Sequence, residues 1–85
     1  MIELYTRAKE CPWCIRAKEL LNEKHYEFKE IVVGEGISRD DFILKFWPNA
    51  KNPRPTVPRI MINDKIVGGF EELKEWLDAN NEGRI

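Results

Sequence analysis

Two cysteines three positions apart lie where a strand-like segment gives way to a helix-like one. The segment Ile2–Tyr5 alternates apolar and polar residues in the pattern of a half-buried strand. From Pro12 to about Lys24 apolar residues recur at helical spacing, and a proline suits the first helical turn because its missing N–H has no partner there. The short connection holds Cys11 and Cys14, so the fold must bring both sulfurs to the end of a strand and the start of a helix.

The rest of the chain reads as short strands and helices separated by glycine, proline and polar residues. Their periodicity changes between the two-residue repeat of strands and the 3.6-residue repeat of helices. The expected elements are a strand over Tyr26–Val33, a helix that begins after Ser38 and ends before Pro48, a hairpin of Pro58–Ile62 and Lys65–Val67, and a helix from Phe70 to about Asn80.

Local signals support the second helix and the hairpin. Ser38, followed three residues later by Asp41, resembles a capping box at the start of a helix. Asn63-Asp64 is a common two-residue turn between hairpin strands. His25 is expected to end the first helix and has no catalytic role in this interpretation. Six residues on the apolar faces of the later helices are predicted to be core: Phe42, Phe46, Trp47, Leu73, Trp76 and Leu77.

This order predicts an α/β fold of the type β-α-β-α-β-β-α. The first two strands should be parallel, because a helix connects them, and the hairpin strands antiparallel. The result is a four-stranded mixed sheet flanked by three helices. Eighty-five residues suffice for one domain, so residues 1–85 are expected to form a single unit, and we expect a monomer.

Charge and hydropathy restrict the partners and the compartment. The 14 basic and 15 acidic side chains give a net charge of -1, too balanced to attract nucleic acid or an anionic membrane. No apolar stretch approaches the roughly 20 residues of a membrane span, and the first residues lack the pattern of a signal peptide. We therefore expect a reducing cytoplasm, or the host cytoplasm for a viral protein, where two close cysteines serve chemistry rather than a structural bridge.

A cysteine at the start of a helix is suited to thiol chemistry. Unpaired N–H groups and the positive end of the helix dipole favour the thiolate, lowering a thiol pKa from about 8.5 into the range of roughly 3.5–7.5. The thiolate is the species that attacks disulfides. Cys11 is therefore the predicted nucleophile, and Cys14, one turn later on the inward side, would resolve a mixed disulfide. Pro12 stiffens this loop and Trp13 supplies an exposed apolar contact.

The cysteine pair has two other interpretations. A structural zinc site needs four ligands, yet the chain has no other cysteine and a single histidine, His25. Chance spacing is the second alternative, but a CxxC pair at the strand-to-helix junction of a βαβ pattern is typical of redox proteins. We therefore expect no metal.

Three segments, in order, resemble the motifs of glutaredoxins. Leu4-Tyr5-Thr6 before Cys11-Pro12-Trp13-Cys14 is similar to the active-site segment of that family, in which tyrosine usually stands in place of Trp13. Thr56-Val57-Pro58 is similar to the TVP motif, and Gly68-Gly69-Phe70-Glu71-Glu72 to the GG-x-acidic segment. The resemblance covers nearly the whole chain and is nearest to phage-type members. It implies a thioredoxin-like fold with Pro58 in the cis form, facing the active-site loop.

The same resemblance implies a groove for glutathione. Val57, between Thr56 and Pro58, would pair its backbone with the cysteine moiety of the tripeptide. The amides that open the last helix, at Gly69, Phe70 and Glu71, would hold the γ-glutamyl carboxylate. The family usually carries a basic residue three positions before the first cysteine. Here Ala8 occupies that position between Arg7 and Lys9, so either of these two could bind the glycine carboxylate.

The function implied is a glutathione-dependent thiol–disulfide oxidoreductase that reduces protein disulfides and glutathionylated thiols, in electron transport and cell redox homeostasis. Glutathione is the expected reductant, and the expected reaction requires no metal. The first alternative is a redoxin reduced by thioredoxin reductase that donates electrons to ribonucleotide reductase. The second is an iron–sulfur carrier, which the CPWC motif disfavours because such members usually have one active-site cysteine.

Overall fold

The protein folds around a four-stranded mixed sheet in the order β2-β1-β3-β4. The computed structural model describes residues 1–80. Strand β1 pairs in parallel with β2 and antiparallel with β3, and β3 pairs antiparallel with β4. The predicted order β-α-β-α-β-β-α is therefore confirmed. The elements are β1 (Ile2–Arg7), α1 (Pro12–Glu23), β2 (Phe28–Val33), α2 (Arg39–Phe46), β3 (Arg59–Ile62), β4 (Lys65–Gly68) and α3 (Phe70–Asn80).

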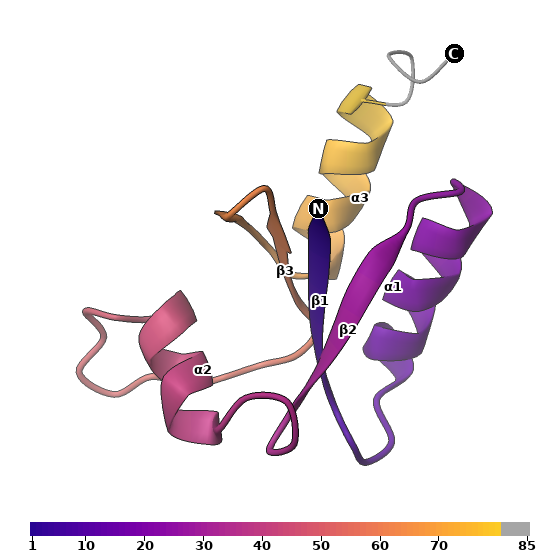
Figure 1. The fold of residues 1–85 in the computed structure, drawn as a ribbon. Coiled ribbons are helices and arrows are strands. Elements are labelled where there is room, and N and C mark those ends of the chain that lie inside the picture. Colours follow the sequence, from indigo (N-terminus) through magenta and orange to yellow (C-terminus); the bar gives the residue numbers. More distant parts are fainter. Residues whose placement is uncertain (81–85) are drawn as a thin grey trace.

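Helices cover both faces of the sheet, with α1 and α3 on one face and α2 on the other (Figure 1). Successive strand residues point to opposite faces, so the central strand β1 is buried on both sides. Leu4 belongs to the core under α1 and α3, whereas the next residue, Tyr5, packs against α2. No helix within residues 1–80 is both long enough and apolar enough to cross a membrane.

The apolar residues form two separate clusters, one on each face. In the smaller cluster Phe42 and Phe46 of α2 pack on Tyr5 and Met61. Trp47 and Trp76 are only partly buried at the margins of the clusters, so the prediction that both are core was too strong for these two rings. The larger cluster consists of Ile2, Leu4, Ala17, Leu21, Ile60, Ile62, Leu73 and Leu77.

The chain turns where the sequence predicts it. His25 has a positive φ of 63°, and the N–H of Tyr26 donates to the carbonyl of Leu21, an arrangement that ends α1 as a Schellman motif does. Asn63 and Asp64 both have positive φ, as a tight turn between hairpin strands requires.

The first strand is longer than the sequence indicates. It continues past Tyr5, because Thr6 and Arg7 pair with Val32 and Val33 of β2. The apolar pattern fades at this point, but the backbone pairing does not depend on apolar side chains. The extension carries the strand to within four residues of Cys11, so the sheet itself supports the loop before that cysteine.

Ser38 provides a test of how α2 begins. Its Oγ accepts a hydrogen bond of 3.0 Å from the N–H of Asp41, the N-cap contact expected from the sequence. We expect Ser38→Ala to lower the free energy of unfolding by about 1 kcal/mol, because that N–H loses its acceptor. Urea denaturation measures the change. Ser38→Asp restores an acceptor and should recover most of the loss; an equal loss in both variants would contradict the capping role.

Candidate active site

Cys11 and Cys14 lie at the start of α1 and are joined by a disulfide, with Cα atoms 5.2 Å apart. Cys11 is the N-cap residue of the helix, and its Sγ accepts a hydrogen bond of 3.3 Å from the N–H of Cys14. Cys14 is 2% exposed and starts the buried face of α1, so it lies on the inward side, as predicted. A sulfur in the cap position receives an N–H that would otherwise be unpaired, and such a contact favours a negative charge on that sulfur.

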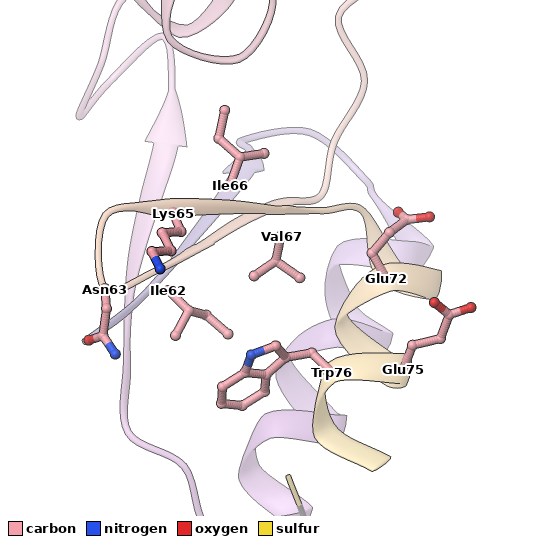
Figure 2. A pocket seen from close by; sticks show the side chains of 8 residues that line it. All are labelled: Ile62, Asn63, Lys65, Ile66, Val67, Glu72, Glu75 and Trp76. Atoms are coloured by element: carbon pink, nitrogen blue, oxygen red, sulfur yellow. The ribbon is translucent and has the colours of Figure 1, made fainter. Parts of the chain in front are cut away.

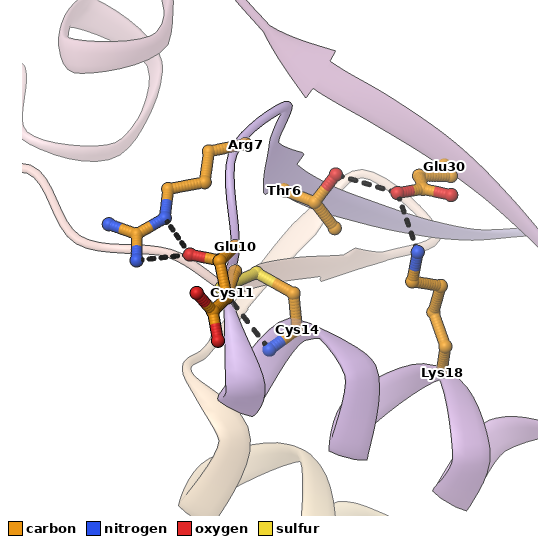
Figure 3. The surroundings of a disulfide bond; sticks show 7 residues. All are labelled: Thr6, Arg7, Glu10, Cys11, Cys14, Lys18 and Glu30. Atoms are coloured by element: carbon orange, nitrogen blue, oxygen red, sulfur yellow. Dashed lines mark hydrogen bonds and ion pairs between the residues drawn. A yellow bond between two sulfur atoms is a disulfide. The ribbon is translucent and has the colours of Figure 1, made fainter.

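The loop before Cys11 is fastened by Arg7, the last residue of β1. Its Nε donates a hydrogen bond of 2.9 Å to the carbonyl of Glu10, and its Nη2 donates to the same oxygen (Figure 3). A planar guanidinium that donates twice to one carbonyl holds the loop at a defined distance from the sheet. Arg7 therefore has a structural role beside the disulfide that its sequence position did not indicate.

A second polar network lies between β1, β2 and α1 (Figure 3). The buried hydroxyl of Thr6 donates a hydrogen bond of 2.7 Å to the carboxylate of Glu30, and Lys18 forms an ion pair of 3.0 Å with the same oxygen. The Thr6 hydrogen bond, together with Lys18, holds the pKa of the Glu30 carboxyl below its ordinary value. The network ties α1 to the sheet one turn beyond Cys14.

Two hollows flank the exposed ring of Trp13. We call them the Arg39 hollow and the Phe70 hollow, and both are lined by Trp13, Thr56 and Val57, which makes them neighbours across the ring. The Arg39 hollow is completed by Arg7, Cys11, Pro12, Val33, Arg39, Phe42 and Pro55. The Phe70 hollow is completed by Pro58, Arg59, Gly69, Phe70, Glu71 and Glu72.

Trp13 is 48% exposed and is held by contacts on two sides. Its ring centroid lies 5.2 Å from that of Phe70, the first residue of α3, and the guanidinium carbon of Arg16 lies 4.8 Å from the ring centroid. The cation–π contact and the ring pair fix an aromatic surface beside the disulfide. The predicted exposure of Trp13 is confirmed, and its role as a contact residue stays a prediction.

Backbone geometry shapes the Phe70 hollow. The Val57–Pro58 peptide bond is cis, as the resemblance implied, and Pro58 is buried. Gly68 has a φ of 127°, and a Cβ there would lie 2.8 Å from Cγ of Glu72, so only glycine fits without a shift. Glu72 in turn accepts a hydrogen bond of 2.7 Å from the N–H of Gly69. That amide is already occupied within the protein.

The structure brings most of the predicted site residues to one surface. The cysteine loop, Arg7, the Thr56-Val57-Pro58 segment and the start of α3 all line the two hollows, whereas Lys9 is exposed and lines neither of them. Arg39, the first residue of α2, lines the hollow that contains Cys11, although its place beside Asp40 and Asp41 in the sequence is typical of a solvated helix start. A cation in the first turn of a helix, where the dipole disfavours it, was the available signal.

Arg59, one of the basic residues expected from the sequence to lie around the site, lines the Phe70 hollow and makes two contacts there. Its guanidinium carbon lies 4.9 Å from the ring centroid of Trp47, and its Nη2 donates a hydrogen bond of 2.8 Å to Oγ1 of Thr56. Arg59 thus connects the end of α2 to the segment that separates the hollows.

Within residues 1–80 no group of three or more histidine, cysteine or acidic side chains is arranged to hold a metal ion.

A third hollow lies between β4 and α3, apart from the disulfide (Figure 2). Ile62, Val67 and Trp76 supply its apolar surface, with Lys65 and the carboxylates of Glu72 and Glu75 at its margin. It is larger than either hollow beside Trp13, but its lining includes no cysteine. The chemistry of the protein therefore belongs to the surface around Cys11.

A redox cysteine pair that opens the first helix of this sheet, next to a cis-proline loop, defines a thiol–disulfide oxidoreductase of thioredoxin-like fold. The family model described as glutaredoxin matches residues 2–67, and the chain belongs to the glutaredoxin family.

Relatives and solved structures agree with this assignment. The chain is 38% identical to glutaredoxin 1 of Rickettsia conorii over 86 residues, which covers 99% of this chain and 76% of the relative. It is similar to the glutaredoxin of Brucella melitensis, with 31% identity, a TM-score of 0.71 and coverage of 98% and 84% of the two chains. A buckwheat glutaredoxin solved as a glutathione complex shares the fold, with 18% identity, a TM-score of 0.70 and coverage of 98% and 73%.

The Glu30 network generates a pH-dependent prediction. Because the pKa of Glu30 is below its ordinary value of 4.5 in the folded protein, its carboxylate stabilises the fold above that pH and stops doing so as the pH falls through the folded-state pKa. Glu30→Gln keeps an acceptor for Thr6 but removes the charge that faces Lys18. The difference in unfolding free energy between wild type and variant should be largest near neutral pH and shrink below pH 4.5.

Urea denaturation across this pH range measures that difference. Glu27→Gln is the matched control, since the carboxylate of Glu27 makes no hydrogen bond or ion pair with the rest of residues 1–80. A constant difference for Glu30→Gln at all pH values would show that its charge does not contribute to stability.

Proposed function

We propose that this protein is a glutathione-dependent thiol–disulfide oxidoreductase that reduces protein disulfides and glutathionylated thiols. The observation that carries the proposal is the convergence of three helix starts on one surface. Cys11 caps α1, Arg39 opens α2 and Phe70 opens α3, and all three line the hollows beside Trp13. Helix N-termini favour anions, and glutathione carries two carboxylates.

The two hollows fit the two ends of such a ligand. The γ-glutamyl carboxylate would lie in the Phe70 hollow against the amides of Phe70 and Glu71, because the amide of Gly69 is already occupied by Glu72. The cysteine moiety would cross Val57, and the glycine carboxylate would enter the Arg39 hollow. Of the two basic residues predicted for it, Arg7 lines that hollow and Lys9 does not. The complex of the buckwheat relative with glutathione adds support at the level of the family.

The cycle follows from the positions of the two sulfurs. The Cys11 thiolate attacks a glutathionylated thiol, a Cys11–glutathione disulfide forms, and the released protein leaves as a thiolate. A second glutathione thiolate then attacks the bound glutathione sulfur, which yields glutathione disulfide and restores Cys11. With a protein disulfide as substrate, Cys14 attacks Cys11 instead and completes the reduction by two electrons. Such a cycle requires a reducing compartment, and we propose the cytoplasm.

The test of this function is turnover of a mixed disulfide between glutathione and cysteamine, followed by NADPH consumption through glutathione reductase. We expect rapid turnover with glutathione and glutathione reductase. Replacement of that system by thioredoxin reductase alone should give little activity. Faster turnover with thioredoxin reductase would reject the proposal in favour of the alternative redoxin.

The roles of the two cysteines are separable by substitution. Cys11→Ser should lose all activity, because serine can still cap α1 but supplies no thiolate. Cys14→Ser should retain reduction of glutathionylated substrates and lose reduction of disulfides that need a second protein thiol. The coupled assay measures both activities. The opposite pattern would exchange the roles of the two sulfurs.

Arg7 and Lys9 make a matched pair for the glycine carboxylate. Arg7→Gln should raise the KM for glutathione by about fivefold, the effect of one partly exposed charge interaction. Lys9→Gln should leave KM unchanged, because Lys9 lines neither hollow. The coupled assay with varied glutathione concentration provides both values. A larger effect from Lys9→Gln would reverse this assignment.

A further inference from the structure

Arg39 has a position that the stability of the fold does not explain. It is the first residue of α2, where the helix dipole disfavours a cation. Its guanidinium makes no hydrogen bond, ion pair or ring contact within residues 1–80, in contrast to Arg7, Arg16 and Arg59. The side chain is exposed and lines the hollow that contains Cys11.

The Arg39 hollow has a defined chemistry. Arg7 and Arg39 give it two positive charges, of which that of Arg7 is bound to the carbonyl of Glu10 and that of Arg39 is unpaired among the described residues. Val33, Phe42 and Val57 supply apolar walls. A carboxylate on a short aliphatic stem matches both features, because guanidinium pairs with carboxylate and the walls contact the stem.

The neighbouring Phe70 hollow has acidic side chains in its lining, in contrast to the basic side chains of the Arg39 hollow. Glu71 and Glu72 line it, and Arg59, its one lining cation, already donates to Thr56 and stacks on Trp47. An acidic side chain that does not reach the amides at the start of α3 would meet like charge there, whereas in the Arg39 hollow it would meet an unpaired cation. The surface on the two sides of Trp13 is therefore electrostatically asymmetric about the reactive sulfur, and such asymmetry discriminates between partners.

We propose that Arg39 is a specificity-determining residue that selects polypeptide substrates with an acidic side chain one or two residues after the target cysteine. The direction rests on the proposed function, in which the ligand runs from the Phe70 hollow across Val57 into the Arg39 hollow. A polypeptide bound in the same direction brings the residues after its cysteine to Arg39. The substrate class is thus a protein disulfide within a Cys-acidic sequence, rather than any accessible disulfide.

The step concerned is the first attack. The Cys11 thiolate attacks a sulfur of the substrate disulfide, the bond from Cys11 to that sulfur forms, and the original disulfide breaks with one thiolate released. Cys14 then attacks Cys11, the second substrate thiolate leaves, and the proton of Cys14 passes to the released thiol. The substrate gains two electrons and the protein dithiol becomes a disulfide, so no further reductant takes part in this half-reaction.

The experiment uses this half-reaction alone, which keeps it independent of glutathione. Reduced protein, freed of reductant, is mixed with homodimeric peptide disulfides acetyl-Ala-Ala-Cys-X-X-Ala-amide, in which X is Glu, Gln or Lys. Stopped-flow tryptophan fluorescence gives the second-order rate constant, divided by that for dithiothreitol with the same peptide to remove intrinsic reactivity. A second series carries the two X residues before the cysteine.

Wild type should react with the Glu peptide about fivefold faster than with the Gln peptide, and the Lys peptide should be slowest. The preference should decline with added salt and be absent when X precedes the cysteine. Arg39→Glu should abolish the preference while the protein remains folded, because glutamate suits a helix start. The matched control is Arg54→Glu, an exposed arginine that lines neither hollow and should keep the preference.

Equal rates for Glu and Gln peptides in wild type would overturn the proposal, as would a preference that survives Arg39→Glu or that follows acidic residues before the cysteine. These results are distinguishable from failure of the proposed function. That function fails if the glutathione-coupled assay shows no turnover, whereas the peptide series contains neither glutathione nor its reductase.

Discussion

The contact on which the site depends is the hydrogen bond from the N–H of Cys14 to the sulfur of Cys11. In most helices the N-cap acceptor is an oxygen whose only task is to pair an exposed N–H. Here the acceptor is also the reacting atom, so the contact that starts α1 stabilises negative charge where the reaction needs it. The same hydrogen bond therefore starts the helix and activates the nucleophile. For this to work, the sheet must position the loop before Cys11 accurately.

That accuracy comes from β1, the central strand, which helices cover on both faces. Its last two residues reach toward the cysteine loop in different ways: Arg7 binds the carbonyl of Glu10, and Thr6 joins the Glu30 carboxylate to which Lys18 of α1 is paired. One interaction holds the loop before the disulfide and the other holds the helix after it. The disulfide thus lies between two polar attachments to the same strand, which restricts movement of both sulfurs relative to the sheet.

Local features of the molecule could be predicted from the sequence, whereas features that join distant segments could not. The cap at Ser38, the hairpin turn and the order of elements all depend on neighbours in the chain, and the resemblance supplied the cis bond before Pro58. The extension of β1 depends on pairing with β2, and the partial burial of Trp76 depends on how α3 lies over the sheet. The place of Arg39 in the hollow with Cys11 depends on the approach of α2 to the cysteine loop, and its one sign in the sequence is a cation at a helix start.

In the proposed function, one small surface serves both a tripeptide and a protein. Both ligands must pass Val57 to place a sulfur at Cys11, and the segment that carries Val57 lines both hollows. A tripeptide ends inside the hollows, so its two terminal carboxylates lie within reach of the helix starts, which bind anions. A polypeptide continues beyond them, and its side chains then meet fixed charges of opposite sign on the two sides of Trp13. Under this proposal, selectivity among proteins arises from residues at the margin of the groove, which can vary without disturbing the sulfur chemistry at its centre.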